Sequence, residues 1–71
     1  MNDLKDIKRM ANQIATAFQG YTEEDAVRET ANHIKSFWDP RMRKQLAEVI
    51  AKDAAALTPV ALAAGKKLGL G

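Results

Sequence analysis

Residues 37–43 read Phe-Trp-Asp-Pro-Arg-Met-Arg, and the Asp39-Pro40 pair at the centre of this run decides how the chain folds. The residue before a proline avoids the α-helical region, so one helix must end close to Trp38. Aspartate is a good N-cap and proline is well tolerated at the first helical position, so the same pair also begins the next helix. The run therefore predicts a sharp corner between two helices.

Helical periodicity extends from this corner in both directions, interrupted by Gly20 and by Thr58-Pro59. Apolar residues recur at helical spacing, and no stretch alternates as a strand does. Thr22 opens a capping box, and Gly20 stands where the preceding helix could end on a left-handed residue. We predict an all-α fold, a small bundle of about four short helices at roughly residues 3–19, 23–38, 40–57 and 59–68.

One apolar face of each predicted helix should form the core. These faces comprise Leu4, Ile7, Ala11, Ile14 and Phe18; Val27, Thr30, Ala31, Ile34 and Trp38; Met42, Leu46, Val49, Ile50 and Leu57; and Val60, Ala64 and Leu68. Thirteen of the 33 apolar residues are alanine, which buries little surface but lets helices approach closely. Gly65 should weaken the last helix by about 1 kcal/mol relative to alanine, and Gly69 and Gly71 predict a frayed end.

The length of 71 residues allows one domain, residues 1–71. A chain this short buries only about 60% of the surface that its unfolded form exposes, so its stability margin is thin. It has no cysteine and one histidine, whereas a zinc site needs about four ligands, so neither a disulfide nor zinc can support the core. We therefore expect a domain whose function is to bind a partner.

The distribution of apolar residues also predicts where in the cell the protein is located. No apolar stretch reaches the roughly 20 residues of a membrane span, and Asp3 and Lys5 stand where a signal peptide would have apolar residues. We expect a cytoplasmic protein that makes no contact with a membrane.

The residues offer little for catalysis. His33 is the only imidazole, and it has no serine or cysteine nucleophile in a recognisable context. Glu23, Glu24 and Asp25 suit the positive end of a helix dipole better than a metal ion. We expect no catalytic, cofactor-binding or metal-binding residue in this chain.

Nucleic-acid binding is an alternative, because the first two predicted helices have the outline of a helix-turn-helix. The recognition helix would then meet DNA with Glu23, Glu24 and Asp25, which repel phosphates. The net charge is only +2, and no basic stripe extends the group Arg41, Arg43 and Lys44. We therefore expect no nucleic-acid partner.

Arg41 and Arg43 stand where a helix dipole disfavours cations, beside Phe37 and Trp38. Tryptophan and arginine are the residue types that most often dominate interface energy, and an arginine fork suits a carboxylate or carbonyl of a partner. One interpretation is that both rings fill the core; the other is a protein-binding patch.

The same run carries a family resemblance. Together with Met10-Ala11-Asn12-Gln13-Ile14-Ala15 and Asn32-His33-Ile34, residues 37–43 resemble the delta subunit of cytoplasmic, NAD-dependent, molybdenum-containing formate dehydrogenases. The similarity extends from about Leu4 to Leu68 and includes the Leu57-Thr58-Pro59 turn. This family often has two aromatics at the end of the first helix, whereas here Ala17 precedes Phe18.

The resemblance implies a non-catalytic accessory subunit that binds no redox cofactor. In such complexes the alpha subunit carries molybdenum bis-pterin guanine dinucleotide and most iron-sulfur clusters. The beta subunit holds flavin mononucleotide and the NAD site, and the gamma subunit holds a further cluster. The implied role of the delta subunit is to support complex assembly, stability or maturation of the molybdenum site.

The partner expected from this resemblance is the large alpha subunit. The residues expected to bind it are Phe37, Trp38, Asp39, Pro40, Arg41, Met42 and Arg43, with Asn12 and Gln13 as secondary candidates. Two alternatives stay open: a transient maturation chaperone of the same enzyme, and a small helix-turn-helix regulator that binds nucleic acid. The isolated chain could also self-associate through the face meant for its partner.

Overall fold

The structure is a computed structural model that describes residues 3–71, so the first two residues of the predicted domain lie outside it. Within these residues the chain forms four α-helices and no strand, which confirms the all-α prediction. The helices are α1 (Asp3–Ala17), α2 (Glu23–Phe37), α3 (Pro40–Asp53) and α4 (Pro59–Lys67), with a short 3-10 helix, η1 (Ala54–Ala56), between the last two.

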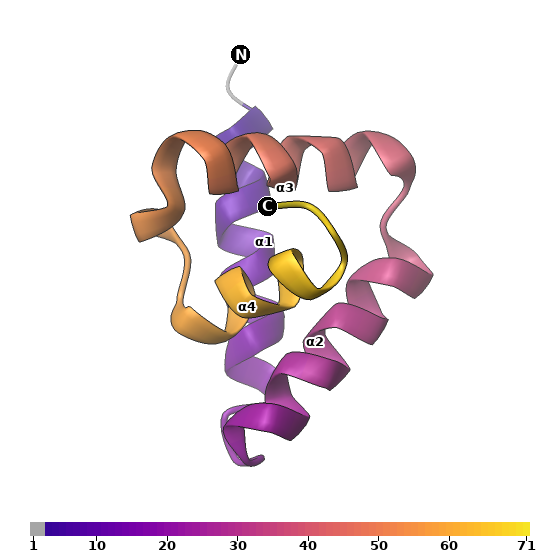
Figure 1. Ribbon diagram of the computed structural model, residues 1–71, viewed down its shortest axis with the longest axis vertical. Helices are drawn as coiled ribbons and strands as arrows, with labels where there is room; N and C mark the ends of the chain where they lie inside the picture. Colours follow the sequence, from indigo (N-terminus) through magenta and orange to yellow (C-terminus); the bar gives the residue numbers. More distant parts are fainter. Residues whose placement is uncertain (1–2) are drawn as a thin grey trace.

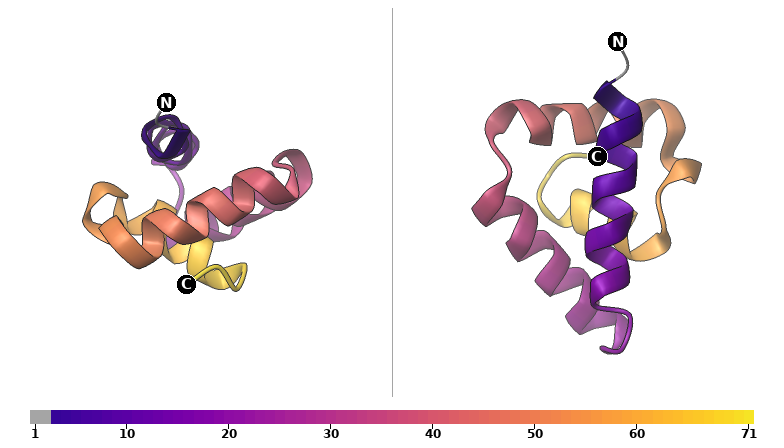
Figure 2. Two further views of the ribbon diagram at one scale, coloured as in Figure 1. Left: turned by 90° about the horizontal axis from the view of Figure 1, so that it is seen from above. Right: turned by 180° about the vertical axis from the view of Figure 1, so that it is seen from behind.

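The helices pack in crossed rather than parallel orientations. α1 lies on one face, where α3 crosses it close to its N-terminal end (Figure 2, right). α4 lies on the opposite side and packs chiefly against α2 (Figure 1). The chain ends beside α3, so its last residues lie against the body of the molecule (Figure 1). Short crossed helices suit a core rich in alanine, because small side chains let the helix axes approach closely.

Three predicted helix starts are confirmed by their capping bonds. The Asp39 carboxylate accepts from the Met42 backbone N–H at 2.8 Å, and Pro40 is the first residue of α3. The Thr22 hydroxyl accepts from the Asp25 N–H, and the Thr58 hydroxyl accepts from the Ala61 N–H, each at 3.2 Å. Each bond satisfies one of the free donors at a helix N-terminus.

The prediction that the third helix extends to residue 57 is wrong. α3 ends at Asp53, and Ala54–Ala56 continue as a 3-10 helix. The alanine run has high helix propensity, which favoured continuation in the sequence. Tertiary contacts override this propensity: α1 binds Asp53 and the Ala56 carbonyl, and Leu57 is turned into the core.

The predicted left-handed residue at Gly20 is also wrong. Among the described residues only Gly69 has a positive φ, of 81°. The end of α1 winds into tighter turns instead, with Phe18, Gln19 and Tyr21 donating to carbonyls three residues back. Such tight turns satisfy terminal carbonyls without a left-handed residue.

The C-terminus is not frayed as predicted. Gly69 N–H donates to Lys66 O and Leu70 N–H donates to Gly65 O, both at 3.0 Å, which is the bond pattern of a Schellman cap. The positive φ of Gly69 allows this reversal, and Leu70 packs back against the core. An apolar anchor beyond the glycine thus orders the end of the chain.

Most of the predicted core residues are buried, but several small residues were missed. Buried side chains from every α-helix form one cluster that includes Ile34, Trp38, Leu46 and Val49. Ala15, Ala26, Ala61 and Gly65 are also buried, although none belonged to a predicted apolar face. These small residues lie where helices approach closely, which a count of large apolar side chains does not detect.

Gly65 lies at a close approach of α4 to α3. A Cβ atom placed there would lie 2.5 Å from Ile50 Cδ1, whereas one at Gly20 would have no atom within 4 Å. We expect Gly65→Val to destabilise the fold by about 1–3 kcal/mol through overpacking, measured by urea unfolding. Gly20→Ala is the control and should be neutral or raise stability by up to about 1 kcal/mol. Equal stability of the two variants would contradict the close approach.

Candidate functional site

The corner at residues 37–43 places its two aromatic rings in opposite environments. Trp38 is only 5% exposed and belongs to the core, and its backbone N–H donates to Ile34 O at the end of α2. Phe37 is 74% exposed, and its ring lies 4.8 Å from that of His33 on the same helix. Of the two interpretations drawn from the sequence, core filling therefore holds for Trp38 but not for Phe37, whose part in binding stays a prediction.

Three other residues of the corner hold the turn itself in place. The Asp39 side chain is occupied by its capping bond to Met42 N–H, and Pro40 forms the exposed first turn of α3. Met42 is half-buried and packs against the core. These residues fix where the neighbouring arginines emerge.

Arg41 and Arg43 emerge on different sides of the corner. Arg41 is exposed and lines a surface hollow of about 340 Å³ between α1 and the start of α3, together with Asp6, Met10 and Gln45. Arg43 lines a second hollow, of about 370 Å³, whose lining includes Lys35 and Lys67. Residues 37–43 therefore do not form one flat patch, because their side chains point toward the core and toward separate surfaces.

Arg43 also explains why cations are tolerated at this helix start. Its Nη1 donates to the Lys35 carbonyl oxygen at 3.3 Å, in the last turn of α2. The negative C-terminal end of α2 adjoins the positive N-terminal end of α3 at this corner. The guanidinium therefore binds a terminal carbonyl of one helix, which offsets its repulsion by the dipole of the other.

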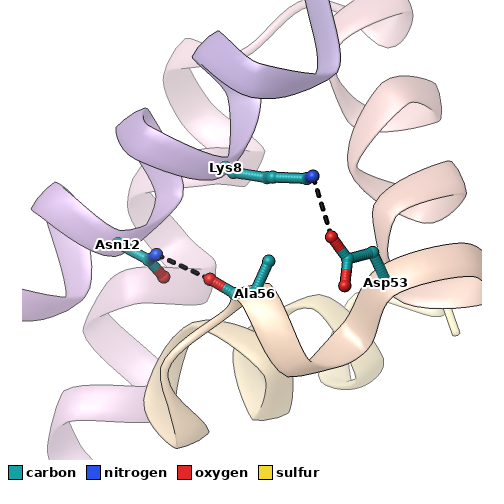
Figure 3. A network of polar contacts seen from close by, with 4 residues as sticks. All are labelled: Lys8, Asn12, Asp53 and Ala56. Atoms are coloured by element: carbon teal, nitrogen blue, oxygen red, sulfur yellow. Dashed lines mark hydrogen bonds and ion pairs between the residues drawn. The ribbon is translucent and has the colours of Figure 1, made fainter.

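Asn12 lies away from the corner and is engaged inside the molecule. Its Nδ2 donates to Ala56 O and its Oδ1 accepts from Thr58 N–H, both at 2.9 Å. Nearby, Lys8 Nζ lies 2.8 Å from Asp53 Oδ2, so two side chains of α1 hold the segment between α3 and α4 (Figure 3). We call the paired bonds of Asn12 the amide clamp. Its neighbour Gln13 is exposed.

These residues all lie within a segment that is similar to a known family. A family model described as the NADH-dependent formate dehydrogenase delta subunit, FdsD, matches residues 7–64. The chain belongs to the FdsD family. No curated protein matches this delta subunit, and no solved structure matches it. The family membership confirms the resemblance inferred from the sequence and makes the chain a subunit of formate dehydrogenase.

The match of the FdsD family covers both the corner and the amide clamp. It ends at residue 64, so the Schellman cap and the lysines at the end of α4 lie beyond it. Partner binding by the nine residues named from the sequence stays a prediction, and the structure now separates those that are exposed from those that hold the fold.

Sequence reasoning missed one aromatic surface of this delta subunit. The rings of Phe18 and Tyr21 meet edge to face with their centroids 5.3 Å apart, and Tyr21 is 53% exposed. Both line a hollow of about 340 Å³ where the start of α4, at Pro59 and Val60, approaches the end of α1. Phe18 was assigned to the core stripe, and Tyr21 in the turn gave no periodic signal. The hollow arises only where three segments meet.

Over residues 3–71, no three histidine, aspartate or glutamate side chains gather as they would around a metal ion. None of the helices in this part of the chain is long and apolar enough to cross a membrane.

Proposed function

We propose that this delta subunit is a non-catalytic accessory subunit that binds the large alpha subunit of formate dehydrogenase. Its role is to support assembly, stability or cofactor maturation of a complex that also contains beta and gamma subunits. The family membership supports a place in the complex. The exposed ring of Phe37, at a corner that also presents Arg41, supports binding to another protein.

The exposure of Phe37 is the observation that carries this proposal. A phenylalanine that leaves water gains about 1.5–3 kcal/mol, and the free chain does not obtain this energy because the ring is 74% exposed. Its neighbour Trp38 shows that the same corner buries an aromatic side chain where the fold needs one. Aromatic residues and arginine are enriched at protein interfaces relative to the rest of the surface.

The proposal assigns the redox chemistry to the other subunits. Molybdenum bis-pterin guanine dinucleotide, iron-sulfur clusters, flavin mononucleotide and NAD are then bound outside this chain. The chain has no cysteine thiolate, which is the usual ligand of an iron-sulfur cluster. We also propose that the complex works in the cytoplasm, where NAD-linked oxidation of formate would take place.

We expect Arg41→Ala combined with Arg43→Ala to lower the yield of the co-purified complex. Arginine hot spots cost about 2 kcal/mol or more when truncated, so affinity for the alpha subunit should fall about 10-fold or more. The measurement is co-purification from cells that express all subunits, followed by an assay of NAD-dependent formate oxidation. The control is Arg28→Ala with Arg9→Ala, two exposed arginines outside the corner. Unchanged yield and activity in the corner variant would contradict the assignment.

The same purification separates a permanent subunit from a transient chaperone. One copy of the chain per alpha subunit in the active enzyme supports the structural role. Loss of the chain from the active enzyme, combined with its presence on alpha subunit that lacks molybdenum, supports the chaperone. Self-association of the isolated chain would be detected by light scattering and should disappear when the alpha subunit is added.

A further inference from the structure

We propose that a second surface of this chain binds an acidic segment of its protein partner, with carboxylates beside an apolar side chain. This surface is the hollow of about 370 Å³ lined by Lys35, Arg43, Lys67, Leu68 and Leu70, which we call the basic hollow. The inference rests on the proposed function, because it takes the partner to be a subunit of the formate dehydrogenase complex.

The basic hollow is built where the ends of two helices and the start of a third come together. Lys35 lies in the last turn of α2, Arg43 in the first turns of α3, and Lys67 at the end of α4. The Schellman cap at Gly69 turns the chain back so that Leu70 joins the same wall. Residues far apart in sequence thus meet at a surface that the fold holds in place.

Within the part of the chain that the structure describes, the cations of the basic hollow have no paired acidic side chain. None of Lys35, Arg43 and Lys67 forms an ion pair with any residue in the range 3–71. Elsewhere on the described surface, acidic partners lie within 4 Å of Lys8, Arg9, Arg28 and Lys52. Like charges around one hollow repel, and a carboxylate placed between them would remove this repulsion.

Two of the three cations also stabilise the C-terminal ends of the helices that carry them. Lys35 and Lys67 stand in last turns, where cations complement the helix dipole. Arg43 uses Nη1 for the Lys35 carbonyl, but a guanidinium has five N–H donors. The arginine can therefore keep its internal bond and still bind a carboxylate at the hollow, as the fork geometry of arginine favours.

The apolar wall favours a protein segment over nucleic acid. Leu68 and Leu70 are half-buried and line the hollow together with the cations. A phosphate backbone offers no apolar group to cover them, whereas an acidic peptide with a leucine- or valine-like residue does. A nucleic acid would also need a longer basic stripe than the three cations of the hollow form.

The test measures binding of the purified chain to formate dehydrogenase that contains the other subunits but lacks this one. We expect Lys35→Glu combined with Lys67→Glu to weaken binding about 10-fold or more, because a desolvated charge pair is replaced by repulsion. The neutral variant Lys35→Gln with Lys67→Gln should weaken it less, and it replaces the first if circular dichroism shows misfolding. The control is Arg28→Glu with Lys52→Glu, which changes the net charge equally outside the hollow.

Each outcome bears on the inference. Weaker binding in the hollow variants, with the control unchanged and the difference shrinking at high salt, supports it. Equal binding by the wild-type chain and the charge-reversed chain would overturn it and leave the proposed function intact. Failure of the wild-type chain to bind at all would overturn both. Tight binding of a DNA duplex that depends steeply on salt and is lost in the hollow variant would overturn the acidic occupant.

Discussion

Replacing Trp38 by alanine should bring the domain close to unfolding. Trp38 is 5% exposed and belongs to the single core cluster, and removal of a core aromatic costs about 3–5 kcal/mol. The total stability expected for a domain of this length is only about 4–10 kcal/mol. The measurement is urea unfolding followed by far-UV circular dichroism, since Trp38 is the only tryptophan and the variant would have no tryptophan fluorescence.

The adjacent residue supplies a matched control of similar chemistry. Phe37→Ala removes an aromatic ring that is 74% exposed, so stability should change by no more than about 0.5 kcal/mol. The same variant should weaken binding to the alpha subunit if the proposed function is correct. A large loss of stability in Phe37→Ala, or a small loss in Trp38→Ala, would show that the two rings have been assigned to the wrong environments.

Loss of the amide clamp has the second largest expected effect. Asn12→Ala removes the donor to Ala56 O and the acceptor of Thr58 N–H, leaving two part-buried backbone groups without this partner. Each such loss costs about 1–3 kcal/mol. Because both backbone groups are only part-buried and water can partly replace the amide, we expect the lower part of the summed range, about 2–4 kcal/mol, by urea unfolding. Thr58 also caps α4, so hydrogen exchange should be fastest at the start of that helix.

An isosteric variant distinguishes the loss of the two hydrogen bonds of the amide clamp from the loss of side-chain packing. Asn12→Asp keeps the acceptor for Thr58 N–H but places a second oxygen 2.9 Å from Ala56 O, where the amide donated before. We expect it to be as destabilising as alanine in spite of its conserved shape. The control Gln13→Ala changes an exposed neighbour and should stay within about 0.5 kcal/mol of wild type. An Asn12→Asp chain as stable as wild type would contradict the clamp.

The candidate site shows how far residue types alone can be interpreted. The sequence identified the corner, its helix caps and the nearness of two aromatic residues to two arginines along the chain, because these features depend only on sequence neighbours. It could not decide that Trp38 is core and Phe37 is exposed, since adjacent helical positions differ by 100° and a helix end can bury either. It also grouped Arg41 with Arg43, although α3 directs them to different hollows.

Asn12 shows what residue type and position in the chain do not reveal. Its polar character within a distinctive run suggested a partner outside the chain, and the structure supplies one inside the chain, in backbone 44 and 46 residues away. No local sequence pattern predicts these two bonds, because both partners of Asn12 are main-chain atoms, which are present in any sequence. The Phe18 and Tyr21 surface and the basic hollow escaped prediction for the same reason, since each is assembled from segments distant in sequence.

The sequence by itself determined the helical class, three of the helix starts and the corner at Asp39-Pro40, because periodicity, capping and the geometry of proline act within a few residues. It also carried the FdsD resemblance that the family match confirmed. Only the tertiary structure decided that α3 stops at Asp53, that the C-terminus folds back, and that alanines and Gly65 form the crossings. These features depend on which surfaces of separate helices meet, and that contact energy exceeds the small preferences of single residues.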